Sequence, residues 1–306
     1  MNYELSVIIP VYNEEKTILK AIEKLLGAFK NNTSVQFIIV DDGSTDQTVQ
    51  LLKSSSYLKN DNFIFIFAPK NQCKGAAIRL GLNQAKGEYT IIQDADLEYD
   101  PTDILKLLTK IKAEDLKVVY GSRNLNKANK TGAFHYYWGG RAVTTIANIL
   151  FGQKLTDEPT CYKMFRTDFL QSMPLTCRKF EFCPEVTALV SLEKIRIPEL
   201  PISYNPRSLK EGKKINWIDG LQAIWTLIRL RFQIKNPYLQ RQHAVQPDLF
   251  PHARWPALRL GRLPRQERLL PRLLHPRLEL RGHSSLLVRR PGLADARGGI
   301  RPGDAR

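Results

Sequence analysis

Short runs of apolar residues alternate, along the first half of the chain, with segments in which apolar residues recur every three or four positions. The uninterrupted runs predict buried strands, and the periodic segments predict helices with one apolar face. The expected strands cover 5–11, 37–40, 63–67, 89–93 and 118–120, and the expected helices cover 18–29, 44–52, 74–85 and a segment that begins at 100–101. This alternation predicts an α/β fold with a mostly parallel central sheet and helices on both faces.

Two of these helices carry a signal at their start. Ser44 followed by Gln47 matches a capping box, which places the start of the second helix at Ser44. Asp100 followed by Pro101 places an N-cap residue directly before a proline that is favourable in the first helical turn.

The second half of the chain is less regular. Segment 141–151 is expected to be helical, and 195–204 resembles a strand interrupted by prolines. Segment 215–234 has the pattern of an amphipathic helix and carries Trp217, Trp225 and Phe232. Such a helix either lies in a membrane interface or packs against the domain. No apolar run reaches the ~20 residues of a membrane span.

The net charge of +16 is concentrated toward the end of the 306-residue chain. Residues 241–306 contain 14 arginines, five acidic residues and no lysine. Prolines recur through this stretch and would break any long helix. We therefore expect one catalytic domain over 1–236 and an Arg/Pro-rich tail over 237–306 that is disordered or not native to the protein. A nucleic-acid-binding arm is the alternative interpretation of the tail.

Other features of the composition narrow the function classes. The four cysteines form no CxxC pair, so free thiols are expected. Only His135 precedes the tail, which disfavours a histidine-held zinc or a Ser-His-Asp triad. The start of the chain lacks the pattern of a signal peptide, so we expect a cytoplasmic protein.

Three polar clusters follow predicted strands: 12–14, 41–44 and 94–96. In open α/β sheets ligands bind outside the carboxyl ends of the strands, so these clusters should converge on one rim. Asp94 and Asp96 are two positions apart and should point the same way. Together with Glu98 they offer the oxygen ligands that Mg²⁺ or Mn²⁺ prefers.

Further residues on the same rim are candidates for binding a nucleotide and phosphates. Pro10, Tyr12, Glu14, Val40 and Asp42 follow or end the first two strands, where a ring could stack on a base and carboxylates could accept from it. Arginine binds phosphate oxygens in a bidentate manner. The candidate phosphate ligands are Arg123, Arg141 and Arg207, with Lys213 in the basic loop 210–214.

Taken together, these residues resemble the family 2 glycosyltransferases of the GT-A fold, and in particular the polyprenyl-phosphate sugar synthases of the dolichyl-phosphate mannose and glucose type. The matching segments are SVIIPVYNEE (6–15), VDDGSTDQT (40–48), KGAAIRLGL (74–82), GEYTIIQDADLEYDP (87–101), YGSRN (120–124), WGGRAVTTIANILFG (138–152), LTDEPTCYKMFR (155–166) and YNPRSLKEGKKINWIDG (204–220). The resemblance covers about 1–235.

The resemblance implies a nucleotide diphosphate sugar as donor, a divalent metal, and inversion at the anomeric carbon. Positions that match Pro10, Tyr12, Glu14, Val40 and Asp42 hold the nucleotide in that family. The family also assigns metal and diphosphate contacts to the positions of Asp94, Ala95, Asp96 and Glu98, and phosphate contacts to those of Arg123, Arg207 and Lys213. Lys74, in the matching segment 74–82, is a further candidate for binding the donor. Segment 155–166 departs from the Gly-rich version of the family, because Thr160-Cys161-Tyr162 stands there.

The acceptor remains open between two hypotheses. A polyprenyl phosphate carries an anionic oxygen that needs no strong base, and Arg123, Arg141 and Arg207 would orient it. A sugar hydroxyl needs a base as it attacks, and Asp157 or Glu158 is the candidate. With the lipid phosphate favoured, we expect an enzyme at the inner face of the membrane with no nucleic-acid partner. A non-catalytic protein that binds nucleic acid through its basic tail is the third hypothesis.

Overall fold

The computed structural model describes residues 3–30, 34–129, 134–207 and 217–233. The first half of the chain alternates strands and helices as expected. Its elements are β1 (Tyr3–Val11), α1 (Ile18–Ala28), β2 (Val35–Asp41), α2 (Thr48–Ser54), the 3₁₀ helix η1 (Ser56–Lys59), β3 (Phe63–Phe67), α3 (Lys74–Leu82), β4 (Gly87–Ile92), α4 (Thr102–Ala113) and β5 (Val118–Ser122).

The second half is mostly helical and carries two short strands. Its elements are α5 (Phe134–Phe151), β6 (Lys163–Arg166), α6 (Thr167–Gln171), α7 (Phe182–Leu192), β7 (Glu199–Pro201) and α8 (Trp217–Gln233). The expected helix 215–234 is confirmed within the described part of the chain. The expected strand 195–204 is reduced to the three residues of β7, because prolines at both ends remove amide donors from the ladder.

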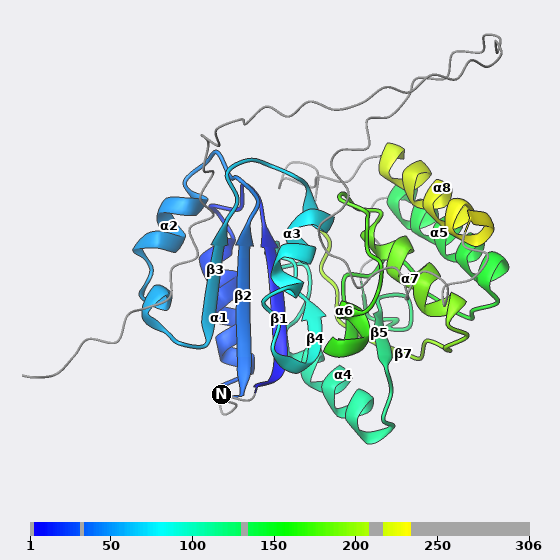
Figure 1. Ribbon diagram of the computed structural model, residues 1–306, viewed down its shortest axis with the longest axis horizontal. Coiled ribbons are helices and arrows are strands. Elements are labelled where there is room, and N and C mark those ends of the chain that lie inside the picture. The colour runs from blue at the N-terminus through cyan, green and yellow to red at the C-terminus, as the bar shows by residue number, and fades with distance from the viewer. Residues whose placement is uncertain (1–2, 31–33, 130–133, 208–216, 234–306) are drawn as a thin grey trace, which may run out of the picture.

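Seven strands form one sheet in the order β3-β2-β1-β4-β6-β5-β7. Neighbouring strands are parallel except where β6 pairs antiparallel with both β4 and β5. Helix α3 lies in front of the strands and α1 behind them in Figure 1, so helices cover both faces. The predicted α/β fold with a mostly parallel sheet is confirmed, and β6 was not predicted.

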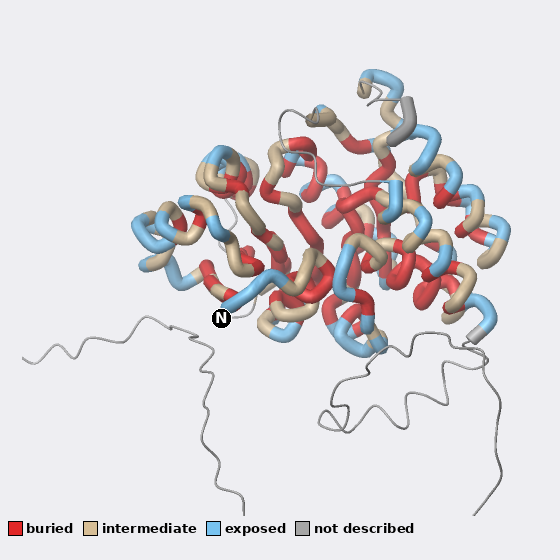
Figure 2. The backbone as a smooth tube through the Cα atoms, turned by 90° about the horizontal axis from the view of Figure 1, so that it is seen from above, coloured by how far each residue is buried: buried red, intermediate tan, exposed pale blue. Residues whose placement is uncertain are grey.

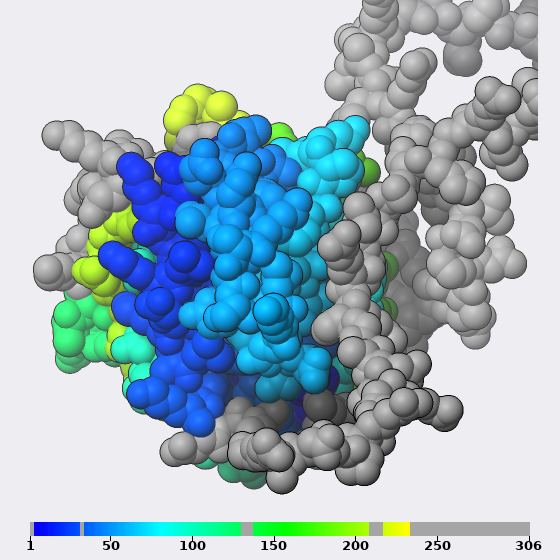
Figure 3. All heavy atoms as spheres, turned by 90° about the vertical axis from the view of Figure 1, so that its left-hand side faces the viewer, coloured from blue at the N-terminus to red at the C-terminus, as the bar shows by residue number. Residues whose placement is uncertain are grey.

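The core runs along the strands. Figure 2 shows buried positions following the sheet through the middle of the molecule, while exposed positions lie on the outer helices. The apolar run of β1 is buried from Leu5 to Ile9 because helices pack on both sides of it. The chain from β1 to α3 forms one end of the molecule, which Figure 3 shows as blue to cyan spheres.

The predicted capping box at Ser44 is wrong. Helix α2 begins at Thr48, and Asp46 accepts the Thr48 amide at 3.0 Å. The Ser44 hydroxyl instead accepts a hydrogen bond from the backbone N–H of Asn13 at 2.9 Å. At the other predicted start, the Asp100 carboxylate accepts the Thr102 amide at 2.9 Å, so the capping role of Asp100 is confirmed.

Helices α5, α7 and α8 pack together beside the sheet (Figure 1). A second small core joins them, formed by Val143, Ala147, Ala188, Leu227 and Leu230. Among the described residues, no helix combines the length and the apolar character that crossing a membrane requires.

Candidate active site

A cavity of about 880 Å³ opens at the carboxyl ends of β1, β2 and β4. Its walls on the sheet side include Tyr12, Glu14, Asp42, Asp94 and Asp96. The three polar clusters that follow predicted strands therefore line one cavity, as expected from the parallel sheet. On the opposite side the cavity extends between α5, α7 and α8.

The loops that follow β1 and β2 are hydrogen-bonded to each other. Besides the bond from Asn13 to Ser44, the Asn13 side chain accepts the Thr45 amide at 2.8 Å, and the Glu14 amide donates to the Thr48 hydroxyl at 2.9 Å. Gly43 has a φ of 72°, and a Cβ there would lie 2.7 Å from the backbone of Lys70. These contacts fix the rim on which Tyr12 and Glu14 lie.

Asp42 presents a buried acceptor at this rim. Its Oδ1 accepts the Gln72 amide at 2.9 Å, while its Oδ2 has no hydrogen-bond partner among the described residues. Burial raises the pKa of Asp42. A ligand N–H or O–H would satisfy the second oxygen, so Asp42 fits a contact to a base or ribose.

Pro10 and Tyr12 line the cavity beside Asp42, in agreement with their predicted place. Val40 does not. It is fully buried within β2 and pairs in register with Pro10. The structure therefore places Val40 in the core under the rim, because it lies one residue before the strand end.

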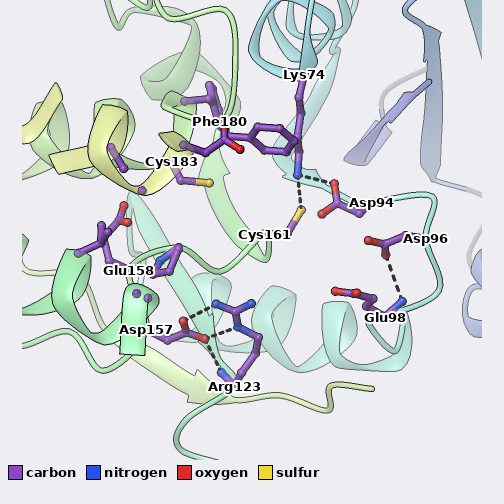
Figure 4. A pocket seen from close by; sticks show the side chains of 18 of the residues that line it. Lys74, Asp94, Asp96, Glu98, Arg123, Asp157, Glu158, Cys161, Phe180 and Cys183 are labelled. Atoms are coloured by element: carbon purple, nitrogen blue, oxygen red, sulfur yellow. Dashed lines mark hydrogen bonds and ion pairs between the residues drawn. The ribbon is translucent and has the colours of Figure 1, made fainter. Parts of the chain in front are cut away.

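Lys74, at the start of α3, lies on the floor of the cavity (Figure 4). Its Nζ forms an ion pair with Asp94 Oδ1 at 2.6 Å and contacts the Cys161 sulfur at 3.9 Å. Burial alone would lower the pKa of Lys74, but the neighbouring groups, of which Asp94 contributes most, together raise that pKa. Lys74 is therefore a cation in the cavity, as a phosphate or sugar ligand would require.

Arg207 gathers three acids from two segments that lie far apart in the sequence. Its Nη1 lies 3.3 Å from Glu14 Oε2, its Nη2 lies 3.2 Å from Asp96 Oδ2, and its Nε lies 3.8 Å from Glu98 Oε1. The Tyr204 hydroxyl donates to Glu98 Oε2 at 2.6 Å. These contacts join the end of β1 to the loop that follows β4.

The predicted metal ligands Asp94, Asp96 and Glu98 all line the cavity, and Ala95 lies between the first two. Burial raises the pKa of Asp96 to about 7, with a further contribution from Asp94 and Glu98, so negative charge is concentrated here. Carboxylate oxygens are the donor set that Mg²⁺ and Mn²⁺ require, and the residues fit such an ion. Within the described ranges no three acid, histidine or cysteine side chains form a preassembled cluster, and Asp94 is paired with Lys74 while Asp96 is paired with Arg207.

Arg123 follows β5 and is held against Asp157 (Figure 4). The aromatic ring of Tyr204 lies 5.0 Å below its guanidinium. Arg141, on α5, also lines the cavity and donates to the Thr156 carbonyl at 3.4 Å. Both arginines therefore contact the segment that carries Thr156 and Asp157.

The two candidate bases, Asp157 and Glu158, are buried side chains that line the cavity. Burial would raise the pKa of Asp157, but the Arg123 guanidinium outweighs it and lowers that pKa. Glu158 is fully buried and accepts a hydrogen bond from the Thr187 hydroxyl at 2.9 Å. Burial raises the pKa of Glu158, which lines the cavity, and its Oε2 has no hydrogen-bond partner among the described residues.

Sequence reasoning missed the wall contributed by the start of α7, where Phe180, Phe182 and Cys183 line the cavity near Cys161. It also missed Tyr204, which contacts both Glu98 and Arg123. These residues carry no motif, and their approach depends on the packing of α7 and of the chain beyond β7. The predicted ligand Lys213 falls in 208–216, a stretch for which the structure gives no description, as does the tail over 237–306.

Known glycosyltransferases resemble this chain in sequence. The model of the family described as glycosyl transferase family 2 matches residues 6–173, more than half of the chain. The undecaprenyl-phosphate 4-deoxy-4-formamido-L-arabinose transferase of Proteus mirabilis is 26% identical over 215 residues, which are 69% of this chain and 62% of that protein. The UDP-N-acetylglucosamine–dolichyl-phosphate N-acetylglucosaminyltransferase of Methanococcus voltae is 28% identical over 244 residues, 74% of this chain and 95% of that protein.

Solved structures share the fold. Glucosyl-3-phosphoglycerate synthase from Mycobacterium tuberculosis, solved with Mn²⁺, uridine diphosphate and phosphoglyceric acid, superimposes with a TM-score of 0.57 at 17% identity, covering 75% of this chain and 79% of that one. The chain spans between 48% and 62% of the length of the first four curated relatives. The family match, the order of the motifs and the shared fold agree, and the chain belongs to glycosyl transferase family 2.

Proposed function

We propose that this protein transfers a hexose from a nucleotide diphosphate sugar to a polyprenyl phosphate, with inversion at the anomeric carbon. The catalytic domain comprises 1–236. The observation that carries the proposal is the division of one cavity into two halves. Acids and Lys74 line the half at the carboxyl ends of β1, β2 and β4, with Arg207 among them, whereas Arg141 and apolar residues of α5, α7 and α8 line the other half and Arg123 follows β5.

The half at the strand ends suits the donor. The unpartnered oxygen of Asp42 and the ring of Tyr12 would bind the nucleoside, and Lys74 would lie beside the sugar and its diphosphate. A divalent ion held by Asp94, Asp96 and Glu98 would supply a Lewis acid that stabilises the leaving diphosphate. This donor class is also named for the Methanococcus voltae relative.

The opposite half suits an anionic acceptor. The phosphate oxygen forms a bond to the anomeric carbon as the bond from that carbon to the diphosphate breaks, and the electron pair leaves with the nucleotide. An ionised phosphate needs no base for this step, and Arg123 and Arg141 would hold it in place. The ion pair of Asp157 with Arg123 supports a phosphate over a sugar hydroxyl, which needs a base.

The cavity also leads to a surface suited to a lipid. Trp217 and Leu221 line the cavity and are 75% and 55% exposed, and Trp225 and Phe232 extend the same exposed side of α8. An amphipathic helix with such aromatic residues lies in a membrane interface. We therefore infer that the enzyme works at the cytoplasmic face of a membrane, where α8 brings the cavity to the lipid phosphate.

The test is transfer by the full chain to a polyprenyl phosphate in lipid vesicles, with Mn²⁺ and a panel of uridine and guanosine diphosphate sugars. A glycosylated lipid phosphate that forms with one donor, and disappears with EDTA, is the expected result. Arg141→Ala should lose most of this transfer while still hydrolysing the donor slowly. Transfer to the matching polyprenyl alcohol, or to a glycan but not to the phosphate, would overturn the proposal.

A further inference from the structure

The two arginines in contact with acids of the cavity are held in different ways. Arg123 makes two hydrogen bonds of 2.7 Å to Asp157. Arg207 makes longer contacts of 3.2 to 3.8 Å, each to a different acid, and its Nε is buried with no hydrogen-bond partner among the described residues. Short, bidentate, charge-assisted bonds are the strong ones. Arg207 is therefore the less tightly bound of the two.

The backbone of Arg207 is anchored separately from its side chain. Its amide donates to Glu98 Oε1 at 2.9 Å, and Tyr204 holds the other oxygen of the same carboxylate. The guanidinium could thus leave Asp96 and Glu14 while the backbone stays in place. An arginine side chain pivots about its own stem over several ångströms, which is enough to exchange one partner for another.

The acids around Arg207 are the ones a divalent ion would need. Asp96 Oδ2 is taken by Arg207 at 3.2 Å, and Glu98 accepts from the Arg207 amide. All of these side chains are at most 16% exposed. Leaving the carboxylates without a counter-ion would therefore cost substantial free energy. In this arrangement the guanidinium is the counter-ion of the cluster.

We propose that Arg207 holds the carboxylates of the metal site in the absence of metal and gives them up when a divalent ion binds. The guanidinium released in this way is then available to a phosphate in the cavity. Metal binding and the placing of a phosphate-binding arginine become one coupled event. The part of this inference that concerns a phosphate ligand rests on the proposed function. The competition between Arg207 and the metal ion does not depend on that function.

The test is direct Mn²⁺ binding to the full chain, without donor or acceptor, followed by the electron paramagnetic resonance signal of free Mn²⁺. If Arg207 competes with the ion, Arg207→Ala should bind Mn²⁺ more tightly than the wild type, by about tenfold, since several partly buried ion-pair contacts no longer oppose binding. Arg207→Lys keeps a cation and should stay close to the wild type. Guanidinium chloride, compared with sodium chloride at equal ionic strength, should weaken binding to Arg207→Ala selectively.

Arg178→Ala is the matched control, because it removes one exposed arginine charge at the surface. It should leave the Mn²⁺ affinity within about twofold of the wild type, which separates local competition from long-range charge. Equal or weaker Mn²⁺ binding by folded Arg207→Ala would overturn the exchange and leave the proposed function intact. Tighter Mn²⁺ binding by Arg207→Ala, together with no lipid product from the wild type, would support the exchange and count against the proposed acceptor.

Discussion

Arg123 and Asp157 face each other through two parallel hydrogen bonds, from Nε to Oδ2 and from Nη2 to Oδ1, both of 2.7 Å. The backbone amide of Arg123 donates to the same carboxylate at 2.8 Å. Asp157 is almost fully buried, so this carboxylate fixes the arginine on the cavity wall. The Arg123–Asp157 pair therefore bears on two properties, the stability of the cavity wall and the choice between a phosphate and a hydroxyl acceptor.

Replacing Asp157 with Asn should destabilise the protein by about 3 kcal/mol near neutral pH, since a buried guanidinium loses its charged partner. The pKa of Asp157 is lowered by folding, so its contribution is complete above the ordinary carboxyl pKa of about 4. It is lost as the pH falls through the lower pKa of the folded state. Urea unfolding of both proteins from pH 7 to pH 3 measures this difference.

The difference between wild type and Asp157→Asn should be constant above about pH 5 and should shrink below about pH 4. Asp61→Asn, which replaces an exposed acid, is the control and should shift the unfolding midpoint little at any pH. A difference that grew on acidification would mean that Asp157 is not ionised in the folded protein.

The irregular segment 155–161 carries Asp157 and is held by side chains from other elements. Glu199, on β7, accepts the Thr156 amide at 2.7 Å and the Asp157 amide at 3.1 Å. Lys163 is fully buried and donates to the carbonyls of Glu158 and Thr160. Glu199 therefore acts as a positioning residue for Arg123, through the backbone of Asp157.

Glu199→Gln should raise the KM for the acceptor about tenfold and leave the KM for the donor within about twofold, because one of two charged acceptors for buried amides is lost. Steady-state kinetics with either substrate varied would show this split. Glu114→Gln, an exposed glutamate paired with Lys110, should change neither value. A fall in unfolding temperature with both KM values unchanged would leave Glu199 a structural role only.

Much of the site could be predicted because strand ends are readable in the sequence. An apolar run that stops at Asp42 or Asp94 marks both the end of a buried strand and a polar position beside it, and a parallel sheet brings such ends to one rim. The same logic misplaced Val40, which lies one residue before the end of β2 and belongs to the core. The pattern of apolar and polar residues does not show which single residue at the end of a strand is buried and which lies on the rim.

Other parts depend on contacts between distant segments and leave no local signal. Arg207 lies 193 residues from Glu14, and only the folded chain brings them to 3.3 Å. Strand β6 pairs antiparallel between β4 and β5, although its four residues follow an irregular segment. In the sequence Phe180 and Phe182 resemble ordinary core residues. Only the folded structure places them beside the cavity.

Lys74 gives a third prediction. Its ammonium lies 2.6 Å from Asp94 and points toward Asp94 and Cys161 in Figure 4. Lys74→Met should lower donor turnover by about 10²-fold, the typical loss when one preorganised charge at a reacting group is removed. Lys74→Arg should recover part of the rate. Rates are measured at saturating donor and Mn²⁺, and a Lys86→Met variant should retain the wild-type rate.

If Lys74→Met and Lys74→Arg lost activity equally, the shape of the lysine stem rather than its charge would be the requirement. If neither lost activity, the donor would not reach the floor of the cavity. Circular dichroism and the unfolding temperature of each variant establish that the fold is intact before rates are compared.

The exposed face of α8 gives the last prediction. Trp217, Leu221 and Trp225 are spaced four residues apart and therefore share one side of the helix. The two tryptophans are 75% and 62% exposed. Replacing both with Ser should weaken binding to vesicles containing anionic lipid by about tenfold, because each ring contributes about 1 kcal/mol or less at an interface.

Sedimentation of the protein with vesicles measures this binding, and Leu105→Ser, which changes an exposed apolar residue on α4, is the control. The double variant should keep the unfolding temperature of the wild type, since exposed side chains contribute little to folding. It should also keep its rate of donor hydrolysis in the absence of lipid. A lowered unfolding temperature with unchanged vesicle binding would mean that this face of α8 packs against the protein, and the lipid phosphate would then have to reach Arg141 by another path.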